Sequence, residues 1–170
     1  MEELKNYMQT EASVRMKFII SAIENNYEHF FKLTEDELSA SGMVKITVDN
    51  KPGYPCRVSL KDAEIGEEVL LLTYQHHKTK TPYQSSGPIF VRKNVKTAQL
   101  KTNEIPMMLF HRLLSLRVYD VKGMMIAAKT VDGKHLKKEI DLIFENETAN
   151  YIHIHNSSPG CYNCQVNRVQ

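Results

Sequence analysis

The 170-residue sequence contains no tryptophan, and aromatic residues make up only 8% of it. A platform on which nucleic-acid bases stack is therefore not indicated, because such platforms are built from aromatic rings. The formal net charge is only +2, whereas nucleic-acid-binding domains usually carry dense basic patches. We expect no nucleic-acid partner.

Long apolar runs are also missing. No stretch reaches the roughly 20 apolar residues that a membrane-spanning helix requires, so we expect no membrane partner. The opening residues, MEELKNYMQTEASVR, have neither the basic nor the apolar region of a secretory signal peptide. With three cysteines and no export signal, we expect a cytoplasmic protein with free thiols.

Motifs of common cofactor and catalytic sites are missing as well. The segment Ser85-Ser86-Gly87-Pro88 lacks the Gly-Lys-Ser/Thr ending of a P-loop, and proline has no N–H to donate to a phosphate. Nothing matches a nucleophile elbow, a zincin helix or a dinucleotide fingerprint. The sequence therefore names no cofactor, and whether the protein is an enzyme stays open.

What the chain does contain is a series of short apolar and alternating runs. They predict about seven or eight strands, at residues 16–23, 43–48, 68–74, 88–93, 115–120, 124–130, 149–156 and 164–169, with a further extended segment at 54–60. About three short helices are expected at residues 31–42, 105–114 and 133–146, the first capped by Thr34 with Glu37 and the last by Asp132.

Successive strands are joined mostly by turns, which favours an α+β fold over a doubly wound parallel one. We expect a largely antiparallel, strongly curled sheet. The length suits one domain. Residues 16–170 are therefore expected to form a single globular domain, preceded by an N-terminal extension at residues 1–15.

A polar pocket is expected where residues 54–92 meet the C-terminal end of the chain. Cys56 directly precedes Arg57 in this segment. The thiol is either a buried structural group or a reactive one, since free cysteine is often buried and a thiolate needs a nearby positive charge. A long polar loop is predicted at residues 75–87, and its adjacent histidines, His76 and His77, are expected to face solvent.

Four arginines lie in or beside predicted strands: Arg57, Arg92, Arg117 and Arg168. An arginine that points inward needs a partner, because an unpaired buried charge is very costly. The acidic residues that could supply structural ion pairs are Asp62, Glu67 and Asp120. Two arginines that converge without a carboxylate would instead clamp an anionic small molecule, either a carboxylate or a phosphate.

Two histidines, His153 and His155, are two positions apart on a predicted strand and therefore share one face. Cys161 and Cys164 have the two-residue gap that is usual in zinc sites, so these four residues could form a tetrahedral zinc site. The competing interpretation is that one histidine is a hydrogen-bonded group at the sheet edge and the other faces solvent.

Five motifs carry a family resemblance: PGYPCRVSLKDAEIGEEVLLL, PYQSSGPIFVR, LLSLRVYD, the VDG helix start, and YIHIHNSSPGCY followed by NR. From about Met16 to Val169 the sequence resembles the bacterial family named domain of unknown function 1203. The resemblance implies a compact cytosolic bacterial protein and brings no established activity. The matching positions are Pro55, Cys56, Arg57, Asp62, Gly66, Glu67, Tyr83, Gly87, Phe90, Arg117, Tyr119, Asn156, Gly160, Cys161 and Arg168. Residues 1–15 and Cys164 depart from the family pattern.

The leading functional hypothesis is a small polar pocket for an anionic small molecule. Its candidate catalytic residues are Cys56, His155 and Cys161. Its candidate ligand-binding residues are Arg57, Tyr83, Ser86, Arg117, Tyr119 and Arg168. The alternative is a non-enzymatic binding or interaction module whose motifs serve the fold alone, and the zinc site is a third hypothesis.

Overall fold

The computed structural model describes residues 16–169, and the extension expected at residues 1–15 lies outside this part of the chain. Within the described residues, eight strands pair antiparallel in two sheets, and three short α-helices accompany them. The α+β class expected from the sequence is confirmed. The strands do not form the one curled sheet that was expected, however, but divide into a sheet of five and a sheet of three.

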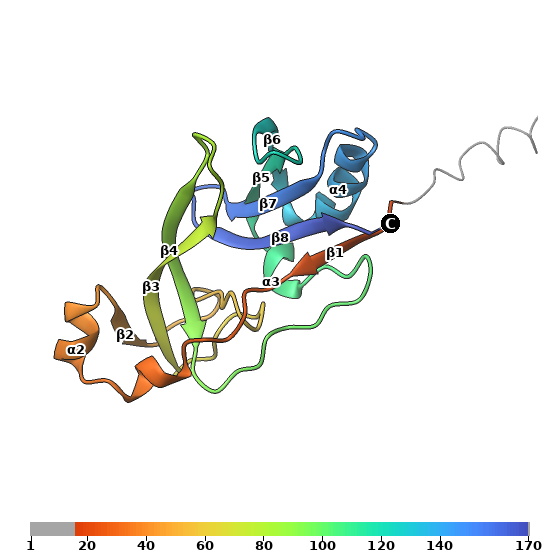
Figure 1. Cartoon of the computed structure of the whole chain (residues 1–170). Coiled ribbons are helices and arrows are strands. Elements are labelled where there is room, and N and C mark those ends of the chain that lie inside the picture. Colours follow the sequence, from red (N-terminus) through yellow and green to blue (C-terminus); the bar gives the residue numbers. More distant parts are fainter. Residues whose placement is uncertain (1–15, 170) are drawn as a thin grey trace, which may run out of the picture.

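The five-stranded sheet has the strand order β1-β8-β7-β5-β6 (Figure 1). Its strands are β1 (Phe18–Ser21), β5 (Leu113–Tyr119), β6 (Met125–Asp132), β7 (Tyr151–Asn156) and β8 (Tyr162–Arg168). Side chains alternate between the two faces of a strand, and one face of this sheet is apolar, with Leu116 and Ile152 fully buried on it. Helix α4 (Leu136–Phe144) packs into this core through one buried side.

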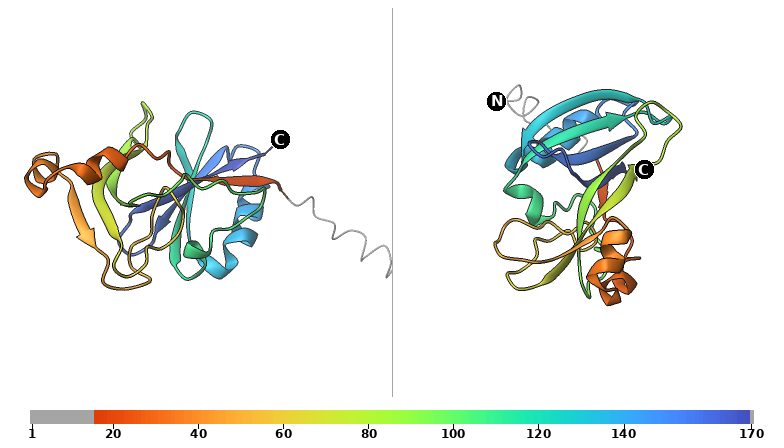
Figure 2. Two further views of the ribbon diagram at one scale, coloured as in Figure 1. Left: turned by 90° about the horizontal axis from the view of Figure 1, so that it is seen from below. Right: turned by 90° about the vertical axis from the view of Figure 1, so that its left-hand side faces the viewer.

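The three-stranded sheet has the order β2-β3-β4, with strands β2 (Val44–Thr47), β3 (Glu68–His77) and β4 (Ser85–Arg92). The 3-10 helix η1 (Glu28–Lys32) and helix α2 (Glu35–Ala40) come before it and share a second core with it. Figure 2 shows α2 beside the three-stranded sheet and α4 beside the five-stranded one. The two sheets cross, so β4 lies against β8 (Figure 1).

Helix starts agree with the sequence. Thr34 Oγ1 accepts a hydrogen bond from the N–H of Glu37, and the Glu37 carboxylate accepts one from the N–H of Thr34, so the expected capping box is confirmed. Asp132 accepts a hydrogen bond from the N–H of Lys134 at the start of the 3-10 helix η2 (Gly133–His135), which leads into α4. No helix in residues 16–169 has both the length and the apolar character needed to cross a bilayer.

Two expected elements are much shorter than predicted. The helix expected at residues 105–114 is reduced to α3 (Met107–Phe110), because the residues that follow it already pair with β6 as part of β5. The segment at 54–60 is extended only at its start, since Pro55 pairs with Asp62 and the chain turns back between them.

The polar loop expected at residues 75–87 is shortened to residues 78–84. β3 continues to His77 and β4 begins at Ser85, where these two residues pair with each other. The expectation that both histidines face solvent is wrong, because His77 is buried and His76 is half-buried. One contact that buries His77 comes from Tyr151, 74 residues further along the chain.

Candidate metal centre

The second face of the five-stranded sheet is polar and aromatic. Alternation along β7 places Tyr151, His153 and His155 on this face and the intervening isoleucines on the apolar one. On the neighbouring strand β5, Arg117 pairs with His153 and Tyr119 pairs with Tyr151, so these side chains share the face. Because β7 is the central strand, the expected sheet-edge position for a histidine is wrong.

A β-bulge in β8 determines which side chains join this face. Ile154 pairs with Cys164, whereas His155 pairs with Tyr162, so β8 has one extra residue between these two pairs. A bulge of this kind re-aims a side chain. Tyr162 consequently faces the histidines, and Cys164 is buried in the apolar core on the other side of the sheet.

The end of strand β3 brings a third histidine to this face. The His76 ring stacks on the Tyr162 ring, with centroids 5.0 Å apart and planes at 5°. Its centroid lies 5.0 Å from that of His155 and 5.9 Å from that of His153. One ring nitrogen from each of the three histidines lies within 4.8 Å of the other two. This group of three is hereafter the histidine triad.

Hydrogen bonds fix the tautomers of the two buried histidines. His153 Nε2 lies 3.0 Å from Oε1 of Gln165, and His155 Nδ1 lies 2.9 Å from the carbonyl oxygen of Gly160. Oxygens of this kind only accept, so both nitrogens carry the proton and donate. The opposite nitrogens, His153 Nδ1 and His155 Nε2, are therefore lone-pair acceptors, and each is buried without a partner among the described residues.

His76 Nδ1 is also buried without a partner among the described residues, although no hydrogen bond to a described residue fixes the tautomer of this ring. Metal-binding histidines commonly donate their second ring N–H to a carbonyl or amide oxygen, which fixes the orientation of the ring. The Gln165 and Gly160 oxygens occupy that position for two members of the triad. The triad thus has both the free lone pairs and the supporting contacts of a metal site.

Burial keeps the triad neutral. Desolvation lowers the pKa of both His153 and His155 to about 3, and that of His76 to about 4. The positive charge of Arg117 lowers all three pKa values further. At pH 7 each imidazole is unprotonated, which is the form that binds a metal ion.

A second histidine network lies next to the triad. His77 Nδ1 is 2.7 Å from the carbonyl oxygen of Tyr83, and its Nε2 is 2.7 Å from the hydroxyl of Tyr151. The carbonyl can only accept, so Nδ1 donates and Nε2 accepts the Tyr151 proton. With both nitrogens used, His77 holds the end of the β3–β4 hairpin against β7 and has no lone pair left for a metal.

Comparison with known families agrees with the sequence motifs. Residues 53–168 match the family described as "Protein of unknown function (DUF1203)". The chain belongs to the DUF1203 family. No curated protein and no solved structure matches the chain. In this DUF1203 protein the matched residues include the whole histidine triad and Arg117, so the candidate metal centre lies within the family domain.

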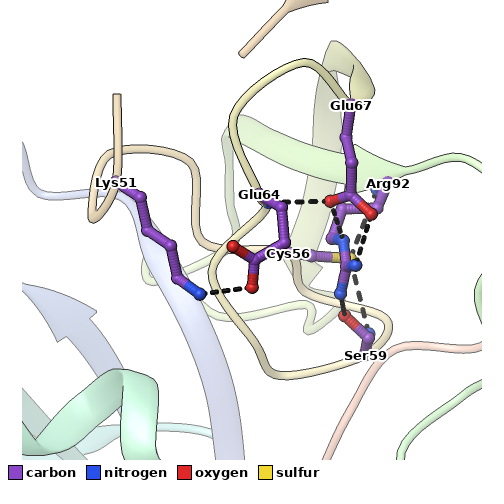
Figure 3. Close-up of polar contacts among 6 residues, drawn as sticks. All are labelled: Lys51, Cys56, Ser59, Glu64, Glu67 and Arg92. Carbon is purple, nitrogen blue, oxygen red and sulfur yellow. Dashed lines mark hydrogen bonds and ion pairs between the residues drawn. The ribbon is translucent and has the colours of Figure 1, made fainter. Parts of the chain in front are cut away.

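Cys56 is fully buried in the DUF1203 protein, and its sulfur atom accepts two backbone hydrogen bonds. Sγ accepts them from the N–H groups of Ser59 (3.4 Å) and Arg92 (3.3 Å), as Figure 3 shows. The Arg92 guanidinium in turn makes a two-pronged ion pair with Glu67, at 2.7 and 2.8 Å. The full burial of the thiol favours the structural interpretation of Cys56 over the reactive one.

Arg57 is also buried, and it connects the Cys56 segment to β8. Its Nε donates to the Tyr162 carbonyl oxygen at 2.7 Å, and a second nitrogen donates to the Pro55 carbonyl oxygen. Burial lowers the pKa of Arg57 to about 10. Nearby cysteines act in the opposite direction, and Cys161 has the largest effect among them. The two ends of the domain do meet, as the sequence predicted, but through Arg57 and the Tyr162 backbone.

Arg168 and Arg112 also have structural partners. Arg168 donates to three carbonyl oxygens at and beyond the end of α4, and its guanidinium lies 4.8 Å from the centre of the Phe144 ring. Asp62 forms its ion pair with Arg112, which lies within the helix that was expected at residues 105–114. The Asp120 carboxylate accepts from backbone N–H groups in the β5–β6 turn.

The other predicted site residues lie at varying distances from the triad. Tyr119 is on the same face, and its ring centroid is 5.1 Å from that of His153. Tyr83 is exposed, and the centroid of its ring lies 6.3 Å from that of Tyr119. Ser86 is exposed on β4. Cys161 is half-buried and does not belong to the group of candidate metal ligands. The four-residue zinc set is therefore not brought together.

The burial of Cys164 argues against its being a metal ligand, because a metal ion binds the thiolate form of cysteine. It is fully buried, and desolvation raises the pKa of its thiol to about 12. Sequence reasoning found His153 and His155 but missed His76 and Gln165. The signal for His76 was present in a pair of histidines directly after the most apolar strand, where a continuing strand would place one of them inward.

Proposed function

We propose that this DUF1203 protein binds a transition-metal ion through His76, His153 and His155. The observation that carries the proposal is the presence of three neutral imidazoles, each with one buried nitrogen that has no partner among the described residues. Leaving a buried acceptor unpaired is costly, so three such groups together require an explanation, and a bound ion is one that satisfies all three. The three unpartnered nitrogens come from three different strand positions and lie close together, which favours their binding one metal ion in common.

Imidazole ligands suit Zn²⁺, Cu²⁺, Ni²⁺ and iron, and Zn²⁺ is the commonest ion held by three histidines. Tetrahedral Zn–N bonds of about 2.0–2.1 Å place the nitrogens roughly 3.3 Å apart. The triad nitrogens lie within 4.8 Å of one another, so ring rotations that bring them together by at most about 1.5 Å suffice. This proposal replaces the two cysteines of the sequence-based zinc hypothesis with one histidine from β3.

Three protein ligands leave one coordination position of a tetrahedral ion for another molecule, as in catalytic zinc sites. His76 and Arg117 are half-buried, whereas His153 and His155 are buried, so a fourth ligand would approach from the side of His76 and Arg117. We assign metal binding and no reaction. The alternative, a module in which the triad serves the fold alone, predicts that the triad binds no metal.

Metal analysis tests the proposal. The protein is treated with a chelator, loaded with Zn²⁺, dialysed and measured by elemental analysis. We expect one ion per chain for the wild type and at least a tenfold weaker affinity for His76→Ala, whose half-buried position limits damage to the core. The matched control is His135→Ala, because His135 is exposed in η2. A wild type without bound zinc, or a His76→Ala protein that binds it as tightly, would refute the proposal.

A further inference from the structure

Arg117 is unusual among the strand arginines of this fold. Arg92 pairs with Glu67, while Arg57 and Arg168 are bonded to backbone carbonyl groups. Arg117 forms no ion pair with any acidic residue between residues 16 and 169. Arg117 is half-buried, and its place on β5, paired with His153, puts its side chain on the face of the histidine triad.

The surroundings of the triad hold positive charge without a matching negative charge. Among the described residues, Arg117 is the cationic side chain that lowers the pKa of all three imidazoles, and no carboxylate shifts these pKa values. A divalent metal ion would add +2 next to the +1 of the guanidinium. Uncompensated charge in a desolvated site is strongly unfavourable, so this site requires an anion once the metal is bound.

We propose that Arg117 makes the metal centre a binding site for a small oxyanion, which contacts the metal at its open position and the guanidinium at the same time. This inference rests on the proposed metal function. A guanidinium matches a carboxylate or a phosphate with two parallel N–H···O bonds. The rings of Tyr119 and Tyr162 flank His153, at 5.1 Å each, and they limit the space around the anion.

A specific energetic relation follows from this arrangement. Without an anion, Arg117 repels the metal, so replacing Arg117 with glutamine should tighten metal binding. With an oxyanion present, the wild type should bind the metal more tightly, because the anion is attracted by both charges. Coupling of this kind is reciprocal, so the metal must strengthen anion binding by the same factor. A purely structural arginine would also repel the metal, but it would not make metal affinity depend on the oxyanion.

Titration with Co²⁺, followed by its visible absorption, measures both effects on the metal-free protein in a non-coordinating buffer. Acetate is the oxyanion probe, and chloride at the same ionic strength is the comparison. For the wild type we expect acetate to lower the Co²⁺ dissociation constant at least tenfold relative to chloride. For Arg117→Gln we expect tighter binding in chloride and no effect of acetate. Lys137→Gln, which removes an exposed positive charge on α4, should behave as the wild type.

The outcomes separate the two proposals. If the wild type binds no Co²⁺ in either salt, the metal function itself fails. If Co²⁺ binds but acetate acts equally on wild type and Arg117→Gln, or if chloride acts as strongly as acetate, the metal function stands and the oxyanion site is refuted. Arg117→Lys keeps the charge and loses the two-pronged fork, so an intermediate effect of acetate is expected, which also guards against misfolding of the glutamine variant.

Discussion

Acidification should destabilise the metal-free protein through its two fully buried triad histidines. Burial lowers the pKa of His153 and His155 to about 3 in the folded protein, against about 6.5 for an unfolded chain. Between these values the unfolded state binds protons that the folded state does not. Their contribution to stability is therefore complete above pH about 6.5 and is lost progressively as the pH falls.

The expected size follows from proton linkage. Each such histidine lowers the free energy of unfolding by about 1.4 kcal/mol per pH unit once the pH is well below 6.5. For both residues together, a change from pH 7 to pH 5 should cost about 4 kcal/mol. That loss is a large part of the free energy of unfolding of a typical domain, which is roughly 5–15 kcal/mol. His76 is half-buried and is left out of this figure.

Urea unfolding at pH 7, 6 and 5, followed by circular dichroism with a chelator present, measures this loss. Carboxylates with a lowered pKa, such as Glu67, add only a small part of this loss, because their unfolded forms only begin to bind protons near pH about 5. His155→Gln should reduce the pH dependence by about half, and His135→Gln should leave it unchanged, because His135 is exposed. A loss of less than about 1 kcal/mol in the wild type would refute the account of the buried triad.

Three further predictions concern the scaffold. Native protein should show one reactive thiol with an aromatic disulfide reagent, and Cys161→Ser should abolish it, because the other two cysteines are buried. Asp62→Asn should lower the free energy of unfolding by about 2–3 kcal/mol in urea, since the Asp62 and Arg112 side chains are only 10% and 15% exposed; the same loss in an Arg112→Gln background would show that the pair does not interact. Gly133→Ala should cost about 3 kcal/mol or more, because a Cβ there would lie 1.9 Å from the Leu109 carbonyl oxygen; a melting temperature within about 2 °C of the wild type would contradict this.

Local rules predicted the parts of the fold that local chemistry decides. The capping box of Thr34 and Glu37 needs only residues within one turn, so the sequence contains all of its information. The period of two on β7 likewise placed His153 and His155 on one face. The match of residues 53–168 to the DUF1203 family was also visible in the motifs.

Features that depend on distant contacts could not be read in the same way. The bulge in β8 reverses the side on which Tyr162 lies relative to Cys164, and no residue type announces it. The sequence also left open which acidic residue pairs with which arginine, since the partner of Asp62 is 50 positions away along the chain. His76 was assigned to a loop because polar residues after an apolar strand usually end it, whereas here they enter the space between two sheets.

X-ray absorption of the zinc-loaded protein tests the central claim most directly, because it counts the ligand types around the ion. Three imidazole ligands with Zn–N distances of about 2.0–2.1 Å are expected for the triad, with a light atom in the remaining position. In His76→Ala the imidazole count should fall to two. Sulfur at about 2.3 Å, or an unchanged imidazole count in that variant, would contradict a metal centre built from His76, His153 and His155.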